Sequence, residues 1–437
     1  MENSNKISKR KNSKSEKKTE KVQAEVSPQE QTSIVEIDDR HLSQKDQTIE
    51  IKTIDDSKSD KYFSEIRFSD MNLSEKTVNS LTESGFETAT EVQAKCIPMA
   101  IQGEDIIGAA KTGSGKSLAF LIPAVEILTK SDDKETKSTR VLVLTPTREL
   151  ALQLFNLSRD LLRFHEEHTC ALIMGGANRK VEAEKLRRGV SLIIATPGRL
   201  LDHLSNTRGF DYSKISLLVI DEADDILKIG FEKELKEIIS LIPKNRQTLL
   251  FSATLSPKVE DIITLSMKNY QYVGIKSKEA TVSTLEQGYV VVDPDKKFRF
   301  LYSFIRKNLS KKIMVFFSTI KAVEFYSALL NYVDIPCKSI HGDQKQQKRS
   351  TTYLEFCGLE KGILLCTDVA QRGLDFPDVD WVIQYDPPHD PSEYLHRVGR
   401  TARGANKKGK ALLVLIPCEI GMVRYLKSYK VNRYLFI

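Results

Sequence analysis

The sequence predicts an α/β protein of two lobes, each a parallel sheet flanked by helices, behind a disordered N-terminal tail. At 437 residues the chain is too long for one typical core. From Tyr62 onward, short apolar runs alternate with segments of helix length. Many of these runs are rich in Val, Ile and Leu and lack period-two alternation, which is typical of strands buried on both faces of a parallel sheet.

The tail covers residues 1–60, which contain no Phe, Trp or Tyr. Residues 1–20 hold seven Lys/Arg against three Glu, whereas residues 21–60 hold five basic against ten acidic residues. Such a segment cannot bury enough apolar surface to offset the ~1–2 kcal/mol per residue lost on ordering the backbone. The basic stretch 6–18 is either an arm for nuclear import or RNA contact, or a plain solvated tail.

Composition excludes several classes of protein. No uncharged run exceeds about a dozen residues, whereas a membrane-spanning helix needs about 20. The basic N-terminus has no apolar stretch behind it, so we expect no secretory signal. The six cysteines form no CxxC pair and no zinc pattern with histidine, so we expect reduced thiols inside the cell. The net charge of +7 permits nucleic-acid binding without indicating it strongly.

The apolar runs fall into two sets on either side of a polar segment, KSKEATVSTL, which we interpret as a linker that lets the lobes move. In parallel sheets of this kind, ligand sites lie beyond the carboxyl ends of the strands. The predicted parts are the tail 1–60, a first lobe 61–276, the linker 277–285, a second lobe 286–420 and a C-terminal extension 421–437. The predicted strands are 105–110, 141–145, 171–175, 191–196, 217–221 and 248–254 in the first lobe, and 312–318, 338–342, 362–367, 381–386 and 411–417 in the second.

A glycine-rich segment, AAKTGSGKS, follows the first of these strands and leads into a helix-forming run. This order suits a phosphate-binding loop, in which Lys116 would contact the β and γ phosphates and Ser117 would hold Mg²⁺. Ala110 stands where the pattern GxxxxGK[ST] requires glycine, so a chance glycine-rich turn is the alternative. The residues of the loop are Ala109, Ala110, Lys111, Thr112, Gly113, Ser114, Gly115, Lys116 and Ser117.

Two carboxylates follow the apolar run 217–220. Asp221 can bind Mg²⁺, and Glu222 beside it can orient or deprotonate an attacking water, as phosphoryl transfer to water requires. The alternative is a solvated acidic turn that caps the next helix.

With these motifs in order, the chain resembles a DEAD-box RNA helicase over nearly all of residues 62–437. The acidic string reads DEAD, and the other motifs follow in sequence. They are GFETATEVQ (85–93), AAKTGSGKS (109–117), PTREL (146–150), GG (175–176), TPGR (196–199), DEAD (221–224), SAT (252–254), HGDQKQQKR (341–349), TDVAQRGLD (367–375) and HRVGRTAR (396–403). The resemblance implies two RecA-like domains that close on ATP and RNA, and an RNA-stimulated ATPase that yields ADP and phosphate.

The resemblance also implies roles at the ATP site. Gln93 would read the adenine, Phe68 would stack on its ring, and Thr90 would support the loop. Asp375 would accept a hydrogen bond from the ribose. Arg400 and Arg403 would reach across from the second lobe as arginine fingers on the γ phosphate. Ser252 and Thr254 with His396 would couple the ATP site to closure, and Arg397 would support the interface between lobes.

For RNA, the resemblance implies mostly phosphate and backbone ligands, so sequence preference should be weak, and 2′-hydroxyl contacts should favour RNA over DNA. Each residue alone could equally serve a turn or the surface. The positions are Pro146, Thr147, Arg148, Gly175, Gly176, Thr196, Pro197, Gly198, Arg199, Gly342, Gln346, Arg349, Thr367 and Gly373. Two alternatives stay open: a non-catalytic ATP-gated RNA clamp, and a DNA helicase on the same lobes.

The second lobe resembles the Has subfamily, whose members act in the nucleolus on pre-ribosomal RNA. We therefore expect a nuclear and nucleolar protein with pre-ribosomal protein partners, a monomeric core and no membrane contact. A basic extension usually follows the core in that subfamily, whereas this sequence stops at Ile437, so grip on RNA outside the core should be weaker or supplied by partners. Ala89, Asp225 and Gln371 depart from the common family pattern.

Overall fold

The computed structural model describes residues 63–109, 114–130, 138–274, 285–368, 376–402, 408–428, 431 and 434–436. Several predictions fall outside these ranges. They concern the tail 1–60, the loop residues Ala110, Lys111, Thr112 and Gly113, most of the linker, and Gln371, Gly373, Asp375 and Arg403.

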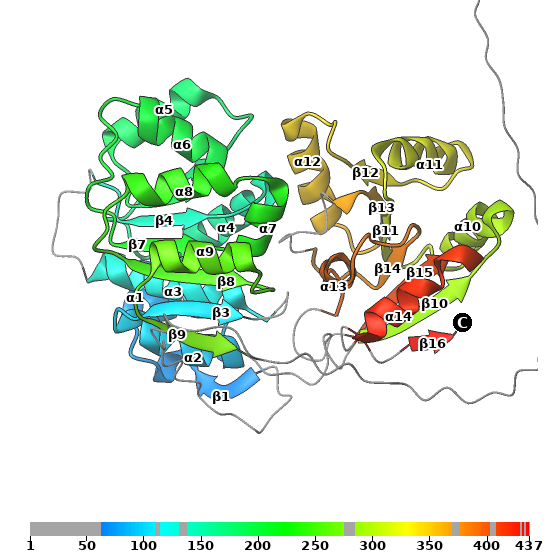
Figure 1. The fold of residues 1–437 in the computed structure, drawn as a ribbon, viewed down its shortest axis with the longest axis horizontal. Helices are drawn as coiled ribbons and strands as arrows, with labels where there is room; N and C mark the ends of the chain where they lie inside the picture. The colour runs from blue at the N-terminus through cyan, green and yellow to red at the C-terminus, as the bar shows by residue number, and fades with distance from the viewer. Residues whose placement is uncertain are drawn as a thin grey trace, which may run out of the picture. The chain divides into compact units, whose positions relative to one another are not determined.

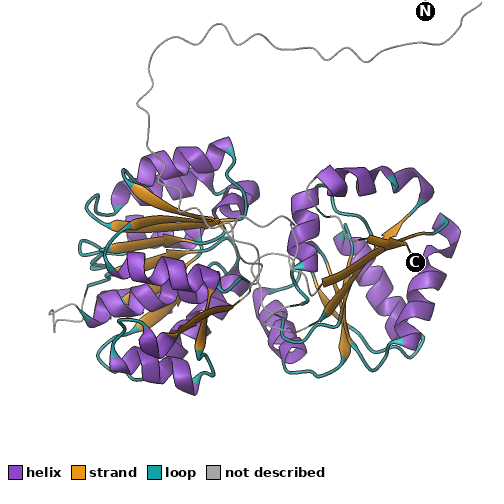
Figure 2. Ribbon diagram, turned by 90° about the horizontal axis from the view of Figure 1, so that it is seen from below, coloured by secondary structure: helices purple, strands orange, loops and turns teal. Residues whose placement is uncertain are grey.

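The first lobe contains a parallel sheet with helices on both faces (Figures 1 and 2). Within the described residues it has seven strands in the order β5-β6-β4-β7-β8-β3-β9. They are β3 (Asp105–Ala109), β4 (Val141–Leu144), β5 (Cys170–Ile173), β6 (Leu192–Ala195), β7 (Leu217–Ile220), β8 (Gln247–Ser252) and β9 (Tyr270–Gly274). A separate antiparallel pair joins β1 (Phe63–Arg67) to β2 (Thr88–Thr90).

The helices of this lobe enclose two cores, one on each face of the sheet. Alternate residues of one strand enter different cores: Val141 and Val143 of β4 pack in the first, and Leu142 and Leu144 in the second. The continuous apolar runs of the sequence therefore reflect burial on both faces. The helices are α1 (Glu75–Glu83), α2 (Glu91–Ile101), α3 (Lys116–Thr129), α4 (Arg148–Leu161), α5 (Arg179–Arg188), α6 (Pro197–Asn206), α7 (Ala223–Ile229), α8 (Glu232–Leu241) and α9 (Pro257–Ser266).

The second lobe repeats this plan (Figure 1). Its described strands form a seven-stranded parallel sheet in the order β12-β13-β11-β14-β15-β10-β16. They are β10 (Leu285–Val291), β11 (Lys312–Phe316), β12 (Lys338–Ile340), β13 (Gly362–Cys366), β14 (Trp381–Gln384), β15 (Gly409–Leu415) and β16 (Tyr434–Phe436). The helices are α10 (Lys297–Lys307), α11 (Ile320–Tyr332), α12 (Gln346–Cys357), α13 (Pro391–Val398) and α14 (Gly421–Ser428).

The predicted fold class is confirmed, and each of the eleven apolar runs contains a strand. Sequence reasoning missed β1, β2, β9, β10 and β16, because these strands lie at or near sheet edges or are short and mixed in character. Leu285, placed at the end of the linker, is the buried first residue of β10. The segment 421–437 contributes α14 and β16, and β16 pairs with β10, so its described part belongs to the second lobe.

None of the helices in the described ranges is long and apolar enough to span a bilayer.

The close packing of β3 on β8 generates a stability prediction. A Cβ added at Gly108 would lie 2.4 Å from two ring atoms of Phe251, whose side chain is fully buried. We expect Gly108→Ala to lower the free energy of unfolding by about 1–3 kcal/mol in urea titrations, because the overpacked core must shift. Gly421→Ala, where a Cβ meets open space, should change it by less than about 0.5 kcal/mol. Wild-type stability of Gly108→Ala would contradict this packing.

Candidate functional site

A buried ion pair joins the glycine-rich segment to the acidic string. Lys116 is the first residue of α3, and its Nζ lies 3.0 Å from Oε1 of Glu222, with both side chains at most 7% exposed. Burial alone would lower the pKa of Lys116, but the charges of Glu222 and Asp221 raise it above its ordinary value. Burial would raise the pKa of Glu222, whereas the charge of Lys116 lowers it. Both groups are therefore charged in a site shielded from water.

Two carboxylate oxygens at the end of β7 are free for a ligand. Oδ1 of Asp221 and Oε2 of Glu222 are buried, and neither has a hydrogen-bond partner among the described residues. Burial and the neighbouring charge of Glu222 raise the pKa of Asp221 to about 7, although Lys116 opposes this shift. Unpaired buried carboxylate oxygens fit a hard cation such as Mg²⁺, which would remove the cost of their burial. The residues present thus fit the predicted metal.

The backbone at Glu222 is itself unusual. Glu222 has φ 50° and ψ 52°, a left-handed conformation that costs of order 1–3 kcal/mol outside glycine. This turn separates β7 from α7, so that Glu222 can face Lys116 while Asp224 faces the end of β8. The strain is compensated by the hydrogen bonds and the ion pair of these acidic side chains.

A second set of contacts ties the start of α2 to the glycine-rich segment. Gln93 Oε1 accepts from the N–H of Thr90 (2.8 Å), and Gln93 Nε2 donates to the carbonyl of Gly115 (2.9 Å). Gly115 has φ 87°, and a Cβ there would lie 2.5 Å from Gln93 Nε2, so only glycine fits. Phe68 is 2% exposed within the core of the lobe. Its stacking on adenine, like the adenine contact of Gln93, stays a prediction.

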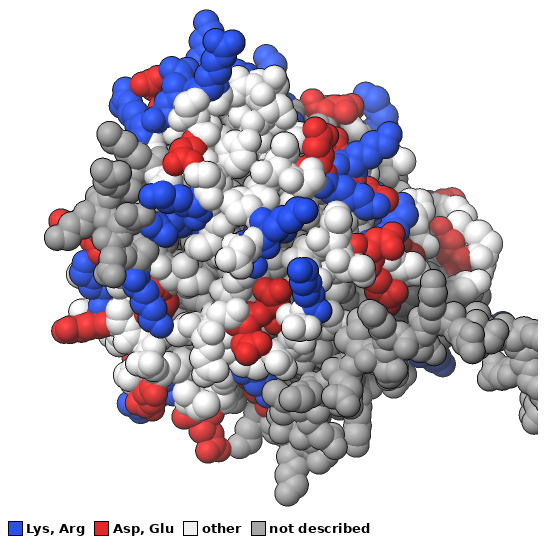
Figure 3. Space-filling model, turned by 60° about the vertical axis from the view of Figure 1, so that its left-hand side comes forward, with Lys and Arg blue, Asp and Glu red and all other residues white. Residues whose placement is uncertain are grey.

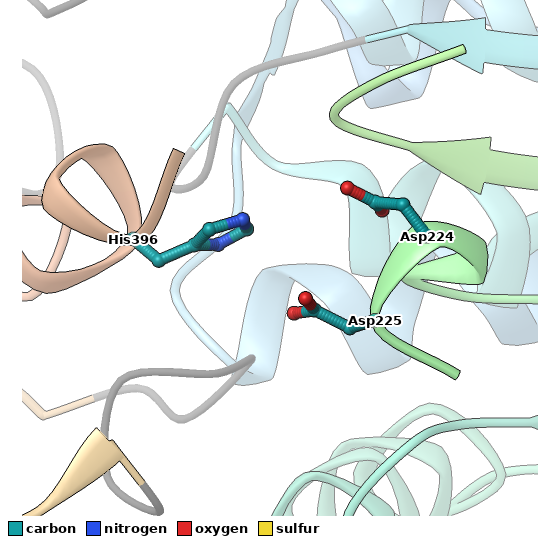
Figure 4. Close-up of side chains that lie close together, drawn as sticks. All are labelled: Asp224, Asp225 and His396. Atoms are coloured by element: carbon teal, nitrogen blue, oxygen red, sulfur yellow. The ribbon is translucent and has the colours of Figure 1, made fainter. Parts of the chain in front are cut away.

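Asp224 connects the acidic string to the segment SAT. Its carboxylate accepts hydrogen bonds from Ser252 Oγ (2.9 Å), Ala253 N–H (3.3 Å) and Thr254 Oγ1 (3.0 Å). His396 on α13 points toward Asp224 and Asp225 from the second lobe, and one ligand atom of each residue lies within 4.8 Å of the others (Figure 4). Because three donors already occupy Asp224, this trio suits contact between lobes better than metal binding.

Three predicted residues of the last motif lie on or just after α13. Arg397 is fully buried and donates to both oxygens of Asp368 (2.7 and 3.0 Å) and to the carbonyl of Asp386. These partners all belong to the second lobe, so Arg397 fastens α13 to its own lobe, and its support of the interface between lobes stays a prediction. Arg400 is also fully buried, and its charge, with that of His396, contributes to the lowered pKa of Glu222 in the first lobe.

Several residues predicted for RNA meet in one cluster that joins the lobes. Arg148 Nη1 donates to Gln346 Oε1 (3.2 Å), Gln346 Nε2 donates to Glu149 Oε1 (2.9 Å), and Arg349 Nη2 lies 2.6 Å from the same carboxylate oxygen. The guanidinium of Arg148 also lies against Gly175 and Gly176, where an added Cβ would approach it to 3.0 Å. Five predicted RNA ligands, Arg148, Gly175, Gly176, Gln346 and Arg349, thus share one face.

The remaining predicted RNA positions are less closely connected. Arg199, near the start of α6, donates to the carbonyl of Ala177 just after the paired glycines (3.2 Å). Thr147 caps α4, and Pro197 opens α6. Thr367 is buried, and its hydroxyl has no partner within the described ranges. The predicted RNA contacts of Pro146, Thr196, Gly198 and Gly342, and the predicted phosphate-loop roles of Ser114 and Ser117, stay predictions.

Sequence reasoning missed two acidic residues that organise this face. Glu149 lies inside the segment PTREL, and its burial beside Arg349 follows only from contact between lobes. Glu182 sits in a segment that reads as a basic surface helix, RKVEAEKLRR, yet it is 4% exposed. Only the first had a signal in the sequence, because it directly follows a predicted RNA ligand.

Comparison with known proteins decides the family. One family model, DEAD/DEAH box helicase, matches residues 90–262, and a second, Helicase conserved C-terminal domain, matches residues 296–405. ATP-dependent RNA helicase HAS1 of Lodderomyces elongisporus is 54% identical over 375 residues, which cover 84% of this chain and 67% of that protein. The chain belongs to the DEAD/DEAH box helicase family.

Two further relatives extend the comparison for this DEAD/DEAH box protein. A probable ATP-dependent RNA helicase, ddx18 of Dictyostelium discoideum, is 54% identical over 376 residues, which cover 85% of this chain and 62% of that protein. The solved structure of Mss116p bound to ssRNA and AMP-PNP superposes with a TM-score of 0.78 and 29% identity, covering 86% of this chain and 80% of that chain. The chain spans about two thirds or less of the length of the curated relatives.

The contacts of Asp224 generate a prediction for the first lobe. Thr254→Val keeps the side-chain shape but removes the donor 3.0 Å from a buried carboxylate. We expect the free energy of unfolding of the first lobe to fall by about 1–3 kcal/mol, measured by urea titration. The matched control is Thr264→Val, whose hydroxyl donates to a helix carbonyl on the exposed face of α9 and should matter by less than about 0.5 kcal/mol. Equal effects of both changes would contradict the role of Thr254.

Proposed function

We propose that the protein is an ATP-dependent RNA helicase that hydrolyses ATP to ADP and phosphate when RNA is bound. The observation that carries the proposal is the buried pair of Lys116 and Glu222, with Arg400 of the second lobe acting electrostatically on the same carboxylate. A site in which groups from both lobes converge on one carboxylate suits a reaction that requires closure. The family and the fold match of the RNA-bound and nucleotide-bound Mss116p support the same activity.

Each charged residue of the site has its own proposed role in phosphoryl transfer. Lys116 binds the β and γ phosphate oxygens, which releases Glu222 from its ion pair. Glu222 then orients the attacking water and accepts its proton, as its lowered pKa keeps it ionised. Arg400 stabilises the charge that develops on the γ phosphate, and we propose the same role for Arg403. Mg²⁺, held by Asp221 and Ser117, would neutralise charge on the phosphate oxygens.

RNA is proposed to bind where Arg148, the paired glycines and Gln346 meet, because this face combines guanidinium groups with close backbone approach. The cluster around Glu149 is complete only when both lobes contribute. Binding of RNA there favours closure, and closure brings Arg400 to the ATP site. We propose that the closed lobes bind one strand of a short duplex and thereby separate it from the other strand.

The substrate we propose is pre-ribosomal RNA, with pre-ribosomal proteins as partners and the nucleolus as the place of action. Support comes from the resemblance to the Has subfamily and from identities of 52–55% with several fungal proteins named HAS1. A non-catalytic clamp on the same fold is disfavoured, because Lys116, Glu222 and Arg400 are all present and the first two are paired.

The enzyme proposal is tested by RNA-stimulated ATP hydrolysis. We expect Glu222→Gln to lower kcat by ~10²–10⁴-fold, because the general base is lost. Lys116→Ala should lower it by at least about 100-fold, because the transferred phosphate loses a positive ligand. Lys130→Ala, an exposed lysine at the other end of α3, and Glu232→Gln on the surface are the matched controls. Hydrolysis that RNA does not stimulate, or that survives both core changes, would rule out the proposal.

The substrate proposal has a separate test. Crosslinking the protein to RNA in cells and sequencing the bound fragments should enrich pre-ribosomal RNA over messenger RNA. Arg148→Ala should deplete those fragments, because a proposed phosphate ligand is lost. Enrichment of messenger RNA instead would leave the enzyme proposal intact and overturn this one.

A further inference from the structure

Glu182 of α5 lies at the centre of a buried polar cluster that no step above uses. Its Oε1 accepts from the N–H of Met174 (3.1 Å), the residue before the paired glycines. Its Oε2 contacts Arg199 Nη1 and lies 3.2 Å from Nε2 of His203, which is fully buried on α6. One carboxylate thus touches the turn before α5 and two residues of α6.

Glu182 and His203 are buried from solvent, and Arg199 is largely so. Burial would raise the pKa of Glu182, but hydrogen bonds from His203, the N–H of Met174 and Arg199 lower it below its ordinary value. His203 completes its own bonding with Thr207 Oγ1, 2.8 Å from Nδ1. Replacing a buried carboxylate that has three partners costs stability, because each partner would lose its acceptor.

A second contact shows that α5 and α6 are held as a pair. Arg179, the first residue of α5, contacts Asp202 on α6 through Nε (2.6 Å) and Nη2 (3.2 Å). The two helices lie side by side in Figure 1. The Gly175–Gly176 turn precedes one helix, and the segment Thr196–Arg199 opens the other, so both proposed RNA segments depend on how this pair is docked.

We propose that Glu182 is a positioning residue that holds the Gly175–Gly176 turn and the start of α6 in the one arrangement that a bound RNA strand requires. It acts through Met174 and Arg199 and does not itself touch RNA. This inference rests on the proposed RNA helicase function. It adds a residue outside every motif that the sequence singled out.

Two explanations of the role of Glu182 predict opposite changes in RNA affinity when its charge is removed. If Glu182 acted only through its charge, its neutralisation would remove a negative group near the RNA phosphates and strengthen RNA binding. If it positions the turn and α6, Glu182→Gln must weaken RNA binding, because Arg199 loses its ion-pair partner and two backbone segments lose their common anchor. The direction of the effect therefore separates the two.

The chain supplies a matched control two residues further along the same helix. Glu184 pairs with Arg187 (3.0 Å) and Arg188 (3.2 Å), whose side chains are 52% and 77% exposed. Figure 3 shows Lys and Arg side chains gathered at the top of the first lobe, the end at which α5 lies in Figure 1. Glu184→Gln removes the same charge from this outer face and leaves the buried cluster intact.

The experiment is a titration of single-stranded RNA into the ATPase reaction of the full chain at fixed salt. We expect Glu182→Gln to raise the RNA concentration for half-maximal stimulation by roughly 10-fold, with kcat at saturating RNA within about twofold of wild type. Glu184→Gln should leave that concentration unchanged or lower it. An unchanged or lowered value for Glu182→Gln, or a loss confined to kcat, overturns the inference.

A double-mutant cycle tests whether Glu182 acts through Arg199. Adding Glu182→Gln to Arg199→Gln should raise the half-maximal RNA concentration by less than about twofold, whereas independent roles would multiply the single effects and overturn the inference. If Glu182→Gln does not fold, His203→Asn serves instead, because it removes only the contact of Nε2 with Glu182. We expect it to raise the half-maximal RNA concentration by about threefold. An unchanged concentration would overturn the inference. Wild-type protein without RNA stimulation would refute the proposed function itself.

Discussion

The buried ion pair of Lys116 and Glu222 is the constraint on which the rest of the site depends. Two opposite charges that are at most 7% exposed each need a partner, and removing one of them without replacement costs ~3–5 kcal/mol. The two residues are separated by 106 positions in the chain, with Lys116 at the start of the helix after β3 and Glu222 just after β7, and both strands belong to one sheet. The parallel strands β3, β8 and β7 therefore do more than form a core, because they place Lys116 and Glu222 at the same carboxyl-terminal edge of the sheet.

Burial on both faces of the sheet explains which strands could be predicted from the sequence. Runs such as 141–144 and 217–220 are apolar throughout because both faces of their strands are buried, so they are recognisable without knowledge of their neighbours. Strands β9 and β10 are partly exposed and mixed in composition, and β16 is only three residues long. Their pairing depends on the finished sheet, which a local pattern cannot report.

The candidate site shows the same division. Lys116, Asp221 and Glu222 stand in local sequence patterns that predict their chemistry directly. Glu149 stands in the segment PTREL, but its partner Arg349 lies 200 residues further along the chain, so the sequence does not predict the pair. Glu182 lies in a segment that reads as a basic surface helix, and its contacts with Met174 and α6 depend on how the helices pack. Burial of an acidic group is the informative observation in both cases, since acidic side chains are rarely buried without partners.

The RNA-facing surface follows from this use of carboxylates. Arg148 donates to Gln346, and Arg349 pairs with Glu149, which also accepts from Gln346. Arg199 contacts Glu182, so three guanidinium groups proposed at or near RNA are already bonded within the protein. A guanidinium held by a carboxylate or an amide oxygen is fixed in direction and keeps other N–H groups for a phosphate. The acidic partners lower the net charge of the face while they fix its geometry. That balance suits an enzyme that must hold RNA in the closed state and release it afterwards, since release is slow from a surface that binds by charge alone.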